Sequence, residues 1–511
     1  MSTFLLPPGL DPAQVLRRLE PGFGLRAEGE TTRRRRYFDT HEHRLLRDGL
    51  WLADEEGELA LEGLDANSAA GPRWRAAAGE RLAAAELADD ARARLSPLIG
   101  ARILLEQARV EEERARWALL NADDKVVAWI DLARGEVEVA GERRPLAPTL
   151  ELAPLRGYDA EGERAAGLLA SLLAPAPGAG HPLHAALAAC GRAPLPPRAA
   201  AAPDPRARAD RALSELLLEQ LQTCEESLCG VVEDLDVEYL HELRVALRKA
   251  RSVLKDGRRV LPPRELEAAS AATRVLAQGT NQLRDLDVFL LARARYRALL
   301  PAELQPGLDP LFAELAARRQ GAQREVAALL EGPAFPRARE AVERLCARAG
   351  QRPCEPLAAH AHRLVRKRLR RVRGASRAIA AHSPDEELHE LRIHCKRLRY
   401  GLELYGGALG DVAPAVGALK QLQKVLGDFN DLSVQRARLL ACLGPDHDPL
   451  VAAAVGGLVT ALAAEQARVR AEYDAAAASF RRSRSQAAFT ALIGAARKGK
   501  PSKGKPGRRA A

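Results

Sequence analysis

The spacing of hydrophobic and polar residues divides the chain into two parts. In residues 1–192, short alternating runs are bounded by turn-forming residues, a pattern typical of β-strands. Runs at 50–53 and 59–61 flank a Glu-Glu-Gly turn and predict a β-hairpin. Further strands are predicted at 117–120, 126–132, 136–139 and 149–152, and helices near 79–95 and 160–173. The pattern predicts an α+β domain with an antiparallel meander.

The pattern changes after residue 204. Apolar residues then recur at steps of three and four through long segments that end at Gly or Pro, as in amphipathic helices. Two landmarks occur twice: HELRV at His241 returns as HELRI at His389, and RDLDV at Arg284 returns as NDLSV at Asn430. Because both offsets are close to 147 residues, we predict an all-α domain made of two duplicated halves, residues 205–350 and 351–495.

Composition marks the boundaries between these parts. Residues 193–204 are rich in Pro and Ala and predict a linker. This places an N-terminal domain at residues 1–192 and the helical domain at 205–495. Residues 496–511 contain seven basic residues and no acidic residue, and they predict a disordered basic tail.

Charge is distributed unevenly over the 511 residues. The net charge is +10, from 78 basic and 68 acidic residues. Residues 1–200 contain 26 basic and 31 acidic residues, which leaves 52 and 37 for the rest. We therefore expect the two parts to have different partners.

Cysteine usage and targeting signals suggest the compartment. The seven cysteines form no CxxC pair, which argues against a disulfide framework and a zinc site. The N-terminus lacks the features of a signal peptide, and the apolar run at 451–464 is too short to span a bilayer. We expect a cytoplasmic protein with no cofactor, no metal and no membrane association.

One predicted helix in each half carries a row of cations. The first ladder consists of His241, Arg244, Arg248, Arg251 and Lys255. At about 100° per residue these side chains share an arc of roughly 80° and span about 21 Å of helix axis. The second ladder consists of His389, Arg392, Lys396 and Arg399, with Glu403 at the position that corresponds to Lys255.

The duplication favours a binding function for the ladders. A single basic row is usually solvated or paired with carboxylates. Repulsion between adjacent cations, however, destabilises the helix by roughly a few tenths of a kcal/mol per pair. An extended anion would compensate the same unfavourable spacing in both halves, and Arg binds phosphate oxygens bidentately. The two histidines lack nearby metal-ligand or acid–base partners on their faces, so we expect them to act as binding donors.

A third basic helix, near residues 362–373, adds two candidates. Arg368 projects close to the centre of an apolar face, where an unpaired charge would be costly. We expect Arg368, with Arg371, to line an interior cavity.

The segments HELRVALRKARSVLK from His241, HELRIHCKRLRYGLELY from His389 and LKQLQKVLGDFNDLSV from Leu419 resemble the CHAD family, the conserved histidine α-helical domain. The resemblance implies two pseudo-symmetric helical bundles around a basic cavity. It also implies non-catalytic binding of inorganic polyphosphate and association with polyphosphate granules. The polyphosphate-binding residues would be both ladders, Arg368 and Arg371.

The N-terminal part resembles the CYTH, or triphosphate tunnel, family through RYFDT at Arg36, RLLRDGL at Arg44, WALL at Trp117 and LEL at Leu150. This implies a tunnel-like antiparallel domain. The family's ExExK motif is absent, and its later acidic strand retains only Glu151. Because metal-held triphosphate needs several converging carboxylates, we predict a degenerate domain with weak or no catalysis.

Two alternative functions remain open. The N-terminal domain could be a metal-dependent triphosphate hydrolase that uses Asp131, Glu136, Glu138 and Glu151. The helical domain could bind nucleic acid, since a basic domain fits any polyanion. Single-strand binders place aromatic residues among their cations, whereas only Tyr400 adjoins the ladders, so polyphosphate is favoured.

Overall fold

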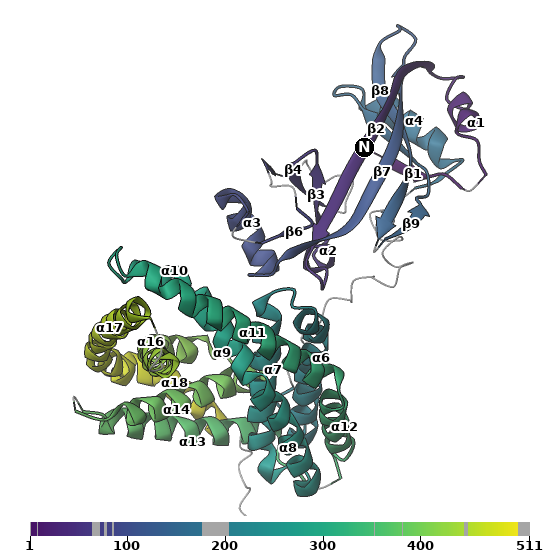
Figure 1. Cartoon of the computed structure of the whole chain (residues 1–511). Coiled ribbons are helices and arrows are strands. Elements are labelled where there is room, and N and C mark those ends of the chain that lie inside the picture. Colours follow the sequence, from purple (N-terminus) through teal and green to yellow (C-terminus); the bar gives the residue numbers. More distant parts are fainter. Residues whose placement is uncertain are drawn as a thin grey trace, which may run out of the picture. The chain divides into compact units, whose positions relative to one another are not determined.

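A computed structural model describes residues 2–7, 9–63, 72–75, 79–83, 86–139, 141–175, 204–351, 353–380, 382–443 and 448–498. The chain divides into two compact units, residues 1–199 and 200–511 (Figure 1). An antiparallel sheet forms the first unit and helices form the second, which confirms the predicted fold class. The predicted linker falls on residues outside the described ranges, apart from Asp204, and so does the tail beyond Lys498.

The described strands of the first unit join in one sheet with the order β11-β1-β10-β8-β7-β2-β3-β4-β5, while β6 pairs with β7 and β9 with β8. They are β1 (Ser2–Leu5), β2 (Gly24–Asp39), β3 (Leu50–Glu55), β4 (Glu58–Gly63), β5 (Arg73–Arg75), β6 (Arg81–Leu82), β7 (Leu104–Leu120), β8 (Val126–Val139), β9 (Glu142–Pro145), β10 (Thr149–Pro154) and β11 (Ala174–Pro175). The predicted hairpin is confirmed as β3 and β4.

The predicted break within β8 is wrong. The sequence prediction gave separate strands at 126–132 and 136–139, but β8 continues through Gly135 between them. An ideal Cβ at this position would lie 2.1 Å from the main-chain oxygen of Glu111. Gly135 therefore permits a close backbone approach inside the sheet instead of ending a strand.

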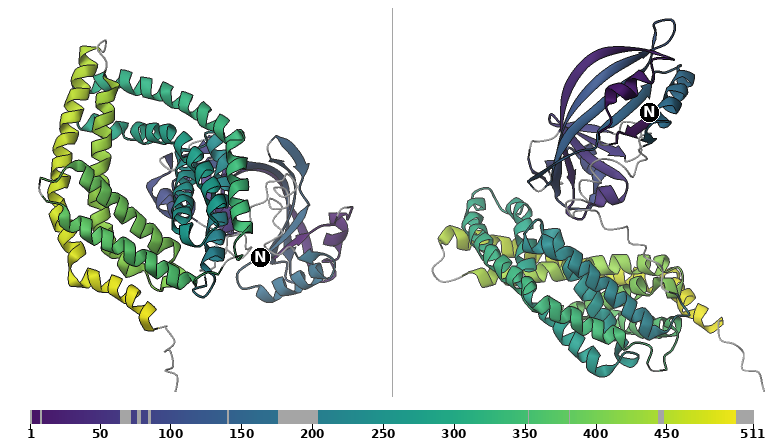
Figure 2. Two further views of the ribbon diagram at one scale, coloured as in Figure 1. Left: turned by 90° about the horizontal axis from the view of Figure 1, so that it is seen from below. Right: turned by 90° about the vertical axis from the view of Figure 1, so that its right-hand side faces the viewer.

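The helices in the described part of the first unit are α1 (Pro12–Arg17), α2 (Arg44–Arg47), α3 (Asp89–Ile99) and α4 (Asp159–Ala170). The helix predicted near 79–95 is misplaced, because residues 81–82 form β6 and α3 begins at Asp89. Asp89 and Asp90 stand in its first turn, where acidic side chains favour a helix N-terminus. Leu16 of α1 and Leu169 of α4 are buried with Leu119, Ile130 and Leu152 of the sheet, so both helices cover one face (Figure 2).

The second unit consists of two helical halves. The first half contains α6 (Ala209–Val232), α7 (Val237–Asp256), α8 (Pro263–Gly279), α9 (Asn281–Leu291), α10 (Arg293–Ala298), α11 (Leu308–Glu331) and α12 (Ala334–Ala347), with short 3-10 turns η3 (Gly257–Arg259) and η4 (Gln305–Gly307). The second half contains α13 (Leu357–Ala378), α14 (Asp385–Leu404), α15 (Gly406–Leu409), α16 (Ala413–Cys442), α17 (Pro449–Arg481) and α18 (Ser483–Lys498).

A shared apolar core joins the halves. Phe289 and Phe312 of the first half pack with Leu432 and Leu458 of the second half in one buried cluster. Among the described residues, α17 alone is long and apolar enough to cross a membrane by length and composition, a test that the core helices of soluble proteins also pass. The sequence prediction that the apolar run at 451–464 is too short to span a bilayer is therefore wrong by length, because this run is part of a helix of 33 residues.

Candidate anion-binding site

The first ladder lies on α7, whose position is fixed at its start and along one face. The Asp236 carboxylate accepts hydrogen bonds from the backbone N–H groups of Glu238 (2.8 Å) and Tyr239 (3.2 Å), which caps the helix. Leu243 and Leu247 are buried, and α7 packs closely against α6. The ladder lies on the neighbouring face of α7, about 100° around the helix axis from Leu243 and Leu247, and this face is left for other contacts.

Arg244 of the first ladder is held by uncharged acceptors. Its guanidinium donates to the main-chain oxygen of Ala277 (3.2 Å), Oγ1 of Thr280 (2.8 Å) and Oδ1 of Asn281 (2.8 Å). Burial, followed by the charges of Arg248 and Arg284, lowers the pKa of Arg244 even though Asp285 acts in the opposite direction. The hydrogen bonds therefore orient this cation without neutralising it.

His241, at the start of the ladder, is half-buried. Burial lowers its pKa first, and the charge of Arg284 lowers it further. Arg284 comes from α9 and belongs to the echoed RDLDV landmark. The sequence prediction did not assign it to the site, although this repeated landmark was the signal that could have identified it.

The second ladder lies on α14 and is partly neutralised. Arg392 forms an ion pair with Asp431 (3.1 Å) and Arg399 forms one with Glu403 (3.2 Å). The Nδ1 atom of His389 hydrogen-bonds Oδ1 of Asn430. Through these contacts the echoed residues Asn430 and Asp431 orient ladder side chains.

The two ladders approach each other near Lys396. Burial lowers the pKa of Lys396 to about 8, and the charges of Arg392, Arg248 and Arg399 contribute in the same direction. Arg248 stands on α7 of the first half, whereas Lys396 stands on α14 of the second half. Cations from both halves thus share one electrostatic environment.

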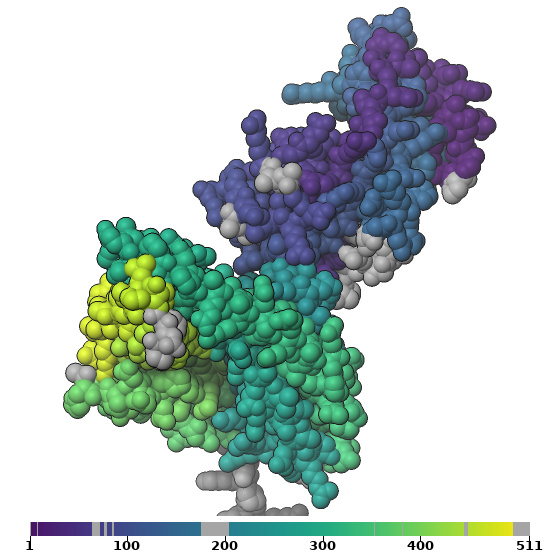
Figure 3. Space-filling view, viewed as in Figure 1, coloured from purple at the N-terminus to yellow at the C-terminus, as the bar shows by residue number. Residues whose placement is uncertain are grey.

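A second meeting point lies at the C-terminal end of α7. Burial lowers the pKa of Lys255, followed by the charges of Arg397, Arg258 and Arg371. Burial, Arg397 and Arg371 likewise lower the pKa of His394. Figure 3 shows the surface hollowed between the first-half and second-half helices.

The sequence prediction included Lys255 and Arg371 but missed their neighbours. Arg397, His394 and Arg258 lie off the ladder periodicity, so helical spacing could not identify them. Among the described residues, no carboxylate forms an ion pair with the five cations Arg248, Arg251, Lys255, Arg371 and Lys396.

Arg368 has a carboxylate partner that the sequence prediction did not name. Its guanidinium forms an ion pair with the buried Asp256 at the end of α7. The hydroxyl of Tyr405 donates to the other Asp256 oxygen at 3.1 Å. A buried carboxylate from the other half thus compensates the charge of Arg368, while its place in the lining of an interior cavity stays a prediction.

Gly401 makes room for this contact between the halves. An ideal Cβ at Gly401 would lie 2.5 Å from a terminal guanidinium nitrogen of Arg368. Asp256, Arg368 and Tyr405 therefore form a buried link, which we call the Asp256 link. It lies next to Lys255 and one turn from Arg371 in the sequence, so it fixes the backbone from which these two cations project.

The N-terminal unit carries the other arginine-rich candidate, and there the charges are paired. Arg33 donates two hydrogen bonds of 2.6 Å to Glu55, and Arg36 pairs with Asp54. In the region proposed for metal chemistry, Arg116 donates to Asp131 at 2.6 and 2.7 Å.

The remaining carboxylates of the hydrolase alternative are also in arginine-rich surroundings. Arg114 pairs with Glu151 at 3.0 Å, and Arg143 pairs with Glu138 at 3.2 Å. Glu136 is exposed. In the described part of the chain, no group of three or more His, Cys, Asp or Glu side chains is arranged to hold a metal ion.

Residues 212–440 match the family model of the CHAD domain, which confirms the CHAD domain predicted from the repeated motifs. Two uncharacterized proteins of Mycobacterium tuberculosis, MT2285 and Rv2226, are each 30% identical over 218 residues. The match covers 39% of this chain and 40% of each relative, so the chain spans less than half the length of these relatives.

Two solved structures are also similar to the chain. The CHAD domain from the plant Ricinus communis is 27% identical, with a TM-score of 0.49, over 56% of this chain and 96% of that chain. PptA from Streptomyces chartreusis is 20% identical, with a TM-score of 0.40, over 56% of this chain and 100% of that chain.

Proposed function

We propose that the helical domain binds inorganic polyphosphate without catalysis, in a basic site between its two halves. The observation that carries the proposal is the approach of unpaired cations from opposite halves, Arg248 toward Lys396 and Lys255 toward Arg371. Lys396 is partly buried, whereas Arg248, Lys255 and Arg371 are exposed, and an anion bound among these cations offsets the repulsion between their charges. Inorganic polyphosphate, whose binding the CHAD resemblance implies, supplies a continuous row of negative charges.

The side chains around the ladders favour a ligand without nucleobases. Tyr400 is the aromatic neighbour, and its ring already lies 5.7 Å from the guanidinium carbon of Arg399. Base stacking on aromatic side chains is the usual means of holding single strands. The ladders therefore favour a polyanion that is recognised through phosphate oxygens alone.

A titration of the full chain tests this proposal. Long-chain polyphosphate and single-stranded DNA of equal charge are each titrated at several salt concentrations, because phosphate contacts are read from the salt dependence. We expect polyphosphate to bind more tightly at physiological salt. Equal affinity for the two polymers would favour nucleic-acid binding instead.

For the N-terminal unit, we propose a degenerate domain without substantial triphosphatase activity. Ion pairs with Arg116 and Arg114 occupy Asp131 and Glu151, so these carboxylates would have to leave their partners to hold a metal ion. Phosphate release from tripolyphosphate is measured with Mg²⁺ and with Mn²⁺. Turnover that disappears in Glu151→Gln would establish the hydrolase alternative.

We further propose a cytoplasmic location on polyphosphate granules. This follows from polyphosphate binding, because a granule presents many chains at once to the basic site. Co-sedimentation of the full chain with isolated granules tests it. Failure of a chain that binds free polyphosphate to co-sediment would remove the granule proposal alone.

A further inference from the structure

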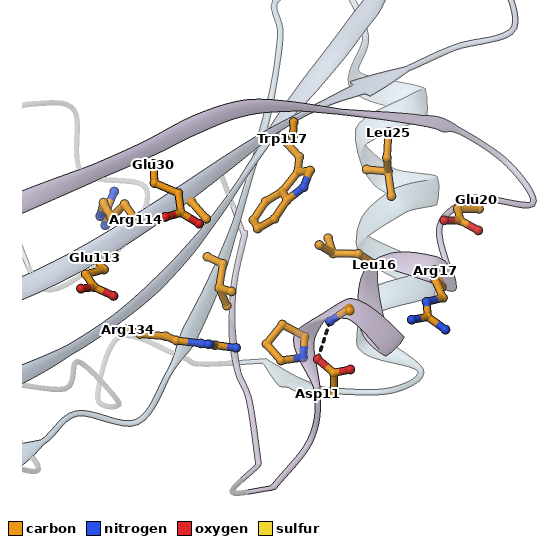
Figure 4. A pocket seen from close by; sticks show the side chains of 15 residues that line it. Asp11, Leu16, Arg17, Glu20, Leu25, Glu30, Glu113, Arg114, Trp117 and Arg134 are labelled. Atoms are coloured by element: carbon orange, nitrogen blue, oxygen red, sulfur yellow. Dashed lines mark hydrogen bonds between the residues drawn. The ribbon is translucent and has the colours of Figure 1, made fainter.

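The N-terminal sheet has a cavity on the face that α1 covers. Its volume is about 560 Å³, within the range of small-molecule sites. Trp117, Leu132 and Leu25 from the sheet and Leu16 from α1 provide apolar walls. Figure 4 shows the indole of Trp117 directed into the cavity, opposite Leu16 and Leu25.

Small side chains on the sheet leave the cavity open. Ala27 and Ala115 line its floor, and their strand neighbours in the register are Trp117 and Leu132. The six-residue helix α1 covers only part of this face. An apolar body can therefore lie on the sheet next to the indole.

A β-bulge directs a carboxylate into this cavity. The register of β2 against β7 shifts between Ala27 and Gly29, and the φ of Gly29 is +136°, a conformation that favours glycine. After the shift, Glu30 pairs with Ala115 and faces the same side as Ala27, although the two are three residues apart. Bulges commonly redirect a side chain in this way.

Three charged side chains, Glu30, Glu113 and Arg134, line one end of the cavity. Glu113 stands opposite Arg134 in the register, and Glu30 stands on the neighbouring strand (Figure 4). Among the described residues, none of these three forms an ion pair. Elsewhere on β2 and β7, side chains such as Arg34 and Glu111 pair across the strands.

From this arrangement we infer a binding site for a small zwitterion with an apolar body, such as an apolar α-amino acid. Glu30 and Glu113 receive its ammonium group, Arg134 receives its carboxylate, and Trp117 contacts its apolar side chain. This combination gives each of these three exposed charges an opposite charge and covers the partly exposed indole of Trp117 at the same time. The inference does not depend on polyphosphate binding by the other unit.

The site is tested with three probes that share one phenyl body. Isothermal titration of the full chain uses L-phenylalanine, 2-phenylethylamine, which lacks the carboxylate, and 3-phenylpropionate, which lacks the amine. We expect L-phenylalanine to bind at least about tenfold more tightly than either analogue, because each lost charge-assisted contact weakens binding by about that factor. Absence of saturable L-phenylalanine binding, or equal binding of an analogue, would overturn the assignment.

Variants localise the binding. Glu30→Gln is expected to weaken L-phenylalanine about tenfold and to leave 3-phenylpropionate unchanged. The matched control Glu111→Gln removes the same charge from β7 outside the cavity and should change neither. Ala115→Leu fills the floor and should abolish binding, with Ala27→Leu as a second filling variant at an exposed position. Undiminished binding in a folded filling variant would contradict this site.

Discussion

The two units contain similar proportions of arginine but use it differently. In the sheet, Arg33, Arg36 and Arg116 have carboxylate partners on neighbouring strands. In the helical unit, Arg248, Lys255 and Lys396 approach other cations. A count of basic residues therefore says little about anion binding. What distinguishes a binding surface is the absence of carboxylate partners, and among the described residues Arg248, Arg251, Lys255 and Lys396 of the ladders form no ion pair, whereas Arg392 and Arg399 do.

In the helical unit, the buried Arg368 is paired with Asp256. Breaking this ion pair has the largest expected effect on stability. Asp256→Ala would leave Arg368 buried without a partner and should lower the free energy of unfolding by about 3–5 kcal/mol. Urea denaturation of the full chain, monitored by helical circular dichroism, measures it. A change below 1 kcal/mol, as expected for an exposed pair, would show that the Asp256 link does not hold the halves together.

Replacing Glu403 tests whether the partial neutralisation of the second ladder weakens polyphosphate binding. Glu403→Lys should restore the fifth cation of the second ladder and release Arg399 from its ion pair. We expect tighter polyphosphate binding, with the slope of log affinity against log salt steeper by about one to two contacts. Glu403→Gln is the control, since it only releases Arg399 and should give the smaller increase. An unchanged slope in Glu403→Lys would place this end of α14 outside the site.

The pKa of Lys396, lowered to about 8 by burial and by neighbouring cations, predicts a pH dependence. Below this pH Lys396 is protonated and contributes a charge, and above it the charge is lost. Polyphosphate affinity should therefore fall as the pH rises from 7 to 9.5. Lys396→Arg should flatten this profile, because Arg stays charged. Profiles that coincide for the two proteins would remove Lys396 from the contact surface.

The smallest effect is expected in the sheet. Arg34 and Glu111 form an exposed pair, so Glu111→Gln should change stability by less than about 1 kcal/mol. It should leave polyphosphate affinity unchanged, since the charge lies outside the helical unit. A clear change in polyphosphate affinity would mean that the sheet takes part in binding.

Local sequence pattern predicted the parts of the structure that depend on periodicity. Both ladders follow from three- and four-residue spacing within single helices, and the duplicated halves follow from two motifs repeated close to 147 residues apart. The long strands β2 and β7 were missed over most of their length because charged residues occupy both faces, so apolar alternation is not visible there. These charged side chains pair with opposite charges on adjacent strands, and sequence periodicity does not identify such pairs.

The periodicity of the sequence also did not predict the contacts between the halves. Arg368 stands 112 residues from Asp256 in the chain, and its position on an apolar face gave no sign of a carboxylate partner. The approach of Arg397 to Lys255 likewise depends on how α7 and α14 pack. Such contacts are set by tertiary packing, whereas the repeated motifs only indicated that two halves exist.

A comparison of two charge-matched variants tests the central claim most directly. One variant changes the ladder cations Arg248, Lys255 and Lys396 to Ala. The control changes three exposed cations of α13 to Ala, namely Arg366, Arg370 and Arg377, which helical spacing places on the side of α13 away from Arg368. Both variants lose three positive charges from the same domain.

Long-chain polyphosphate is titrated into the full-length wild type and both variants at physiological salt. We expect the ladder variant to lose at least about 100-fold in affinity and about three contacts in the salt slope, while the control stays within about threefold of the wild type. Equal losses in the two variants would show that net charge alone attracts the polymer, and would contradict a defined site between the ladders.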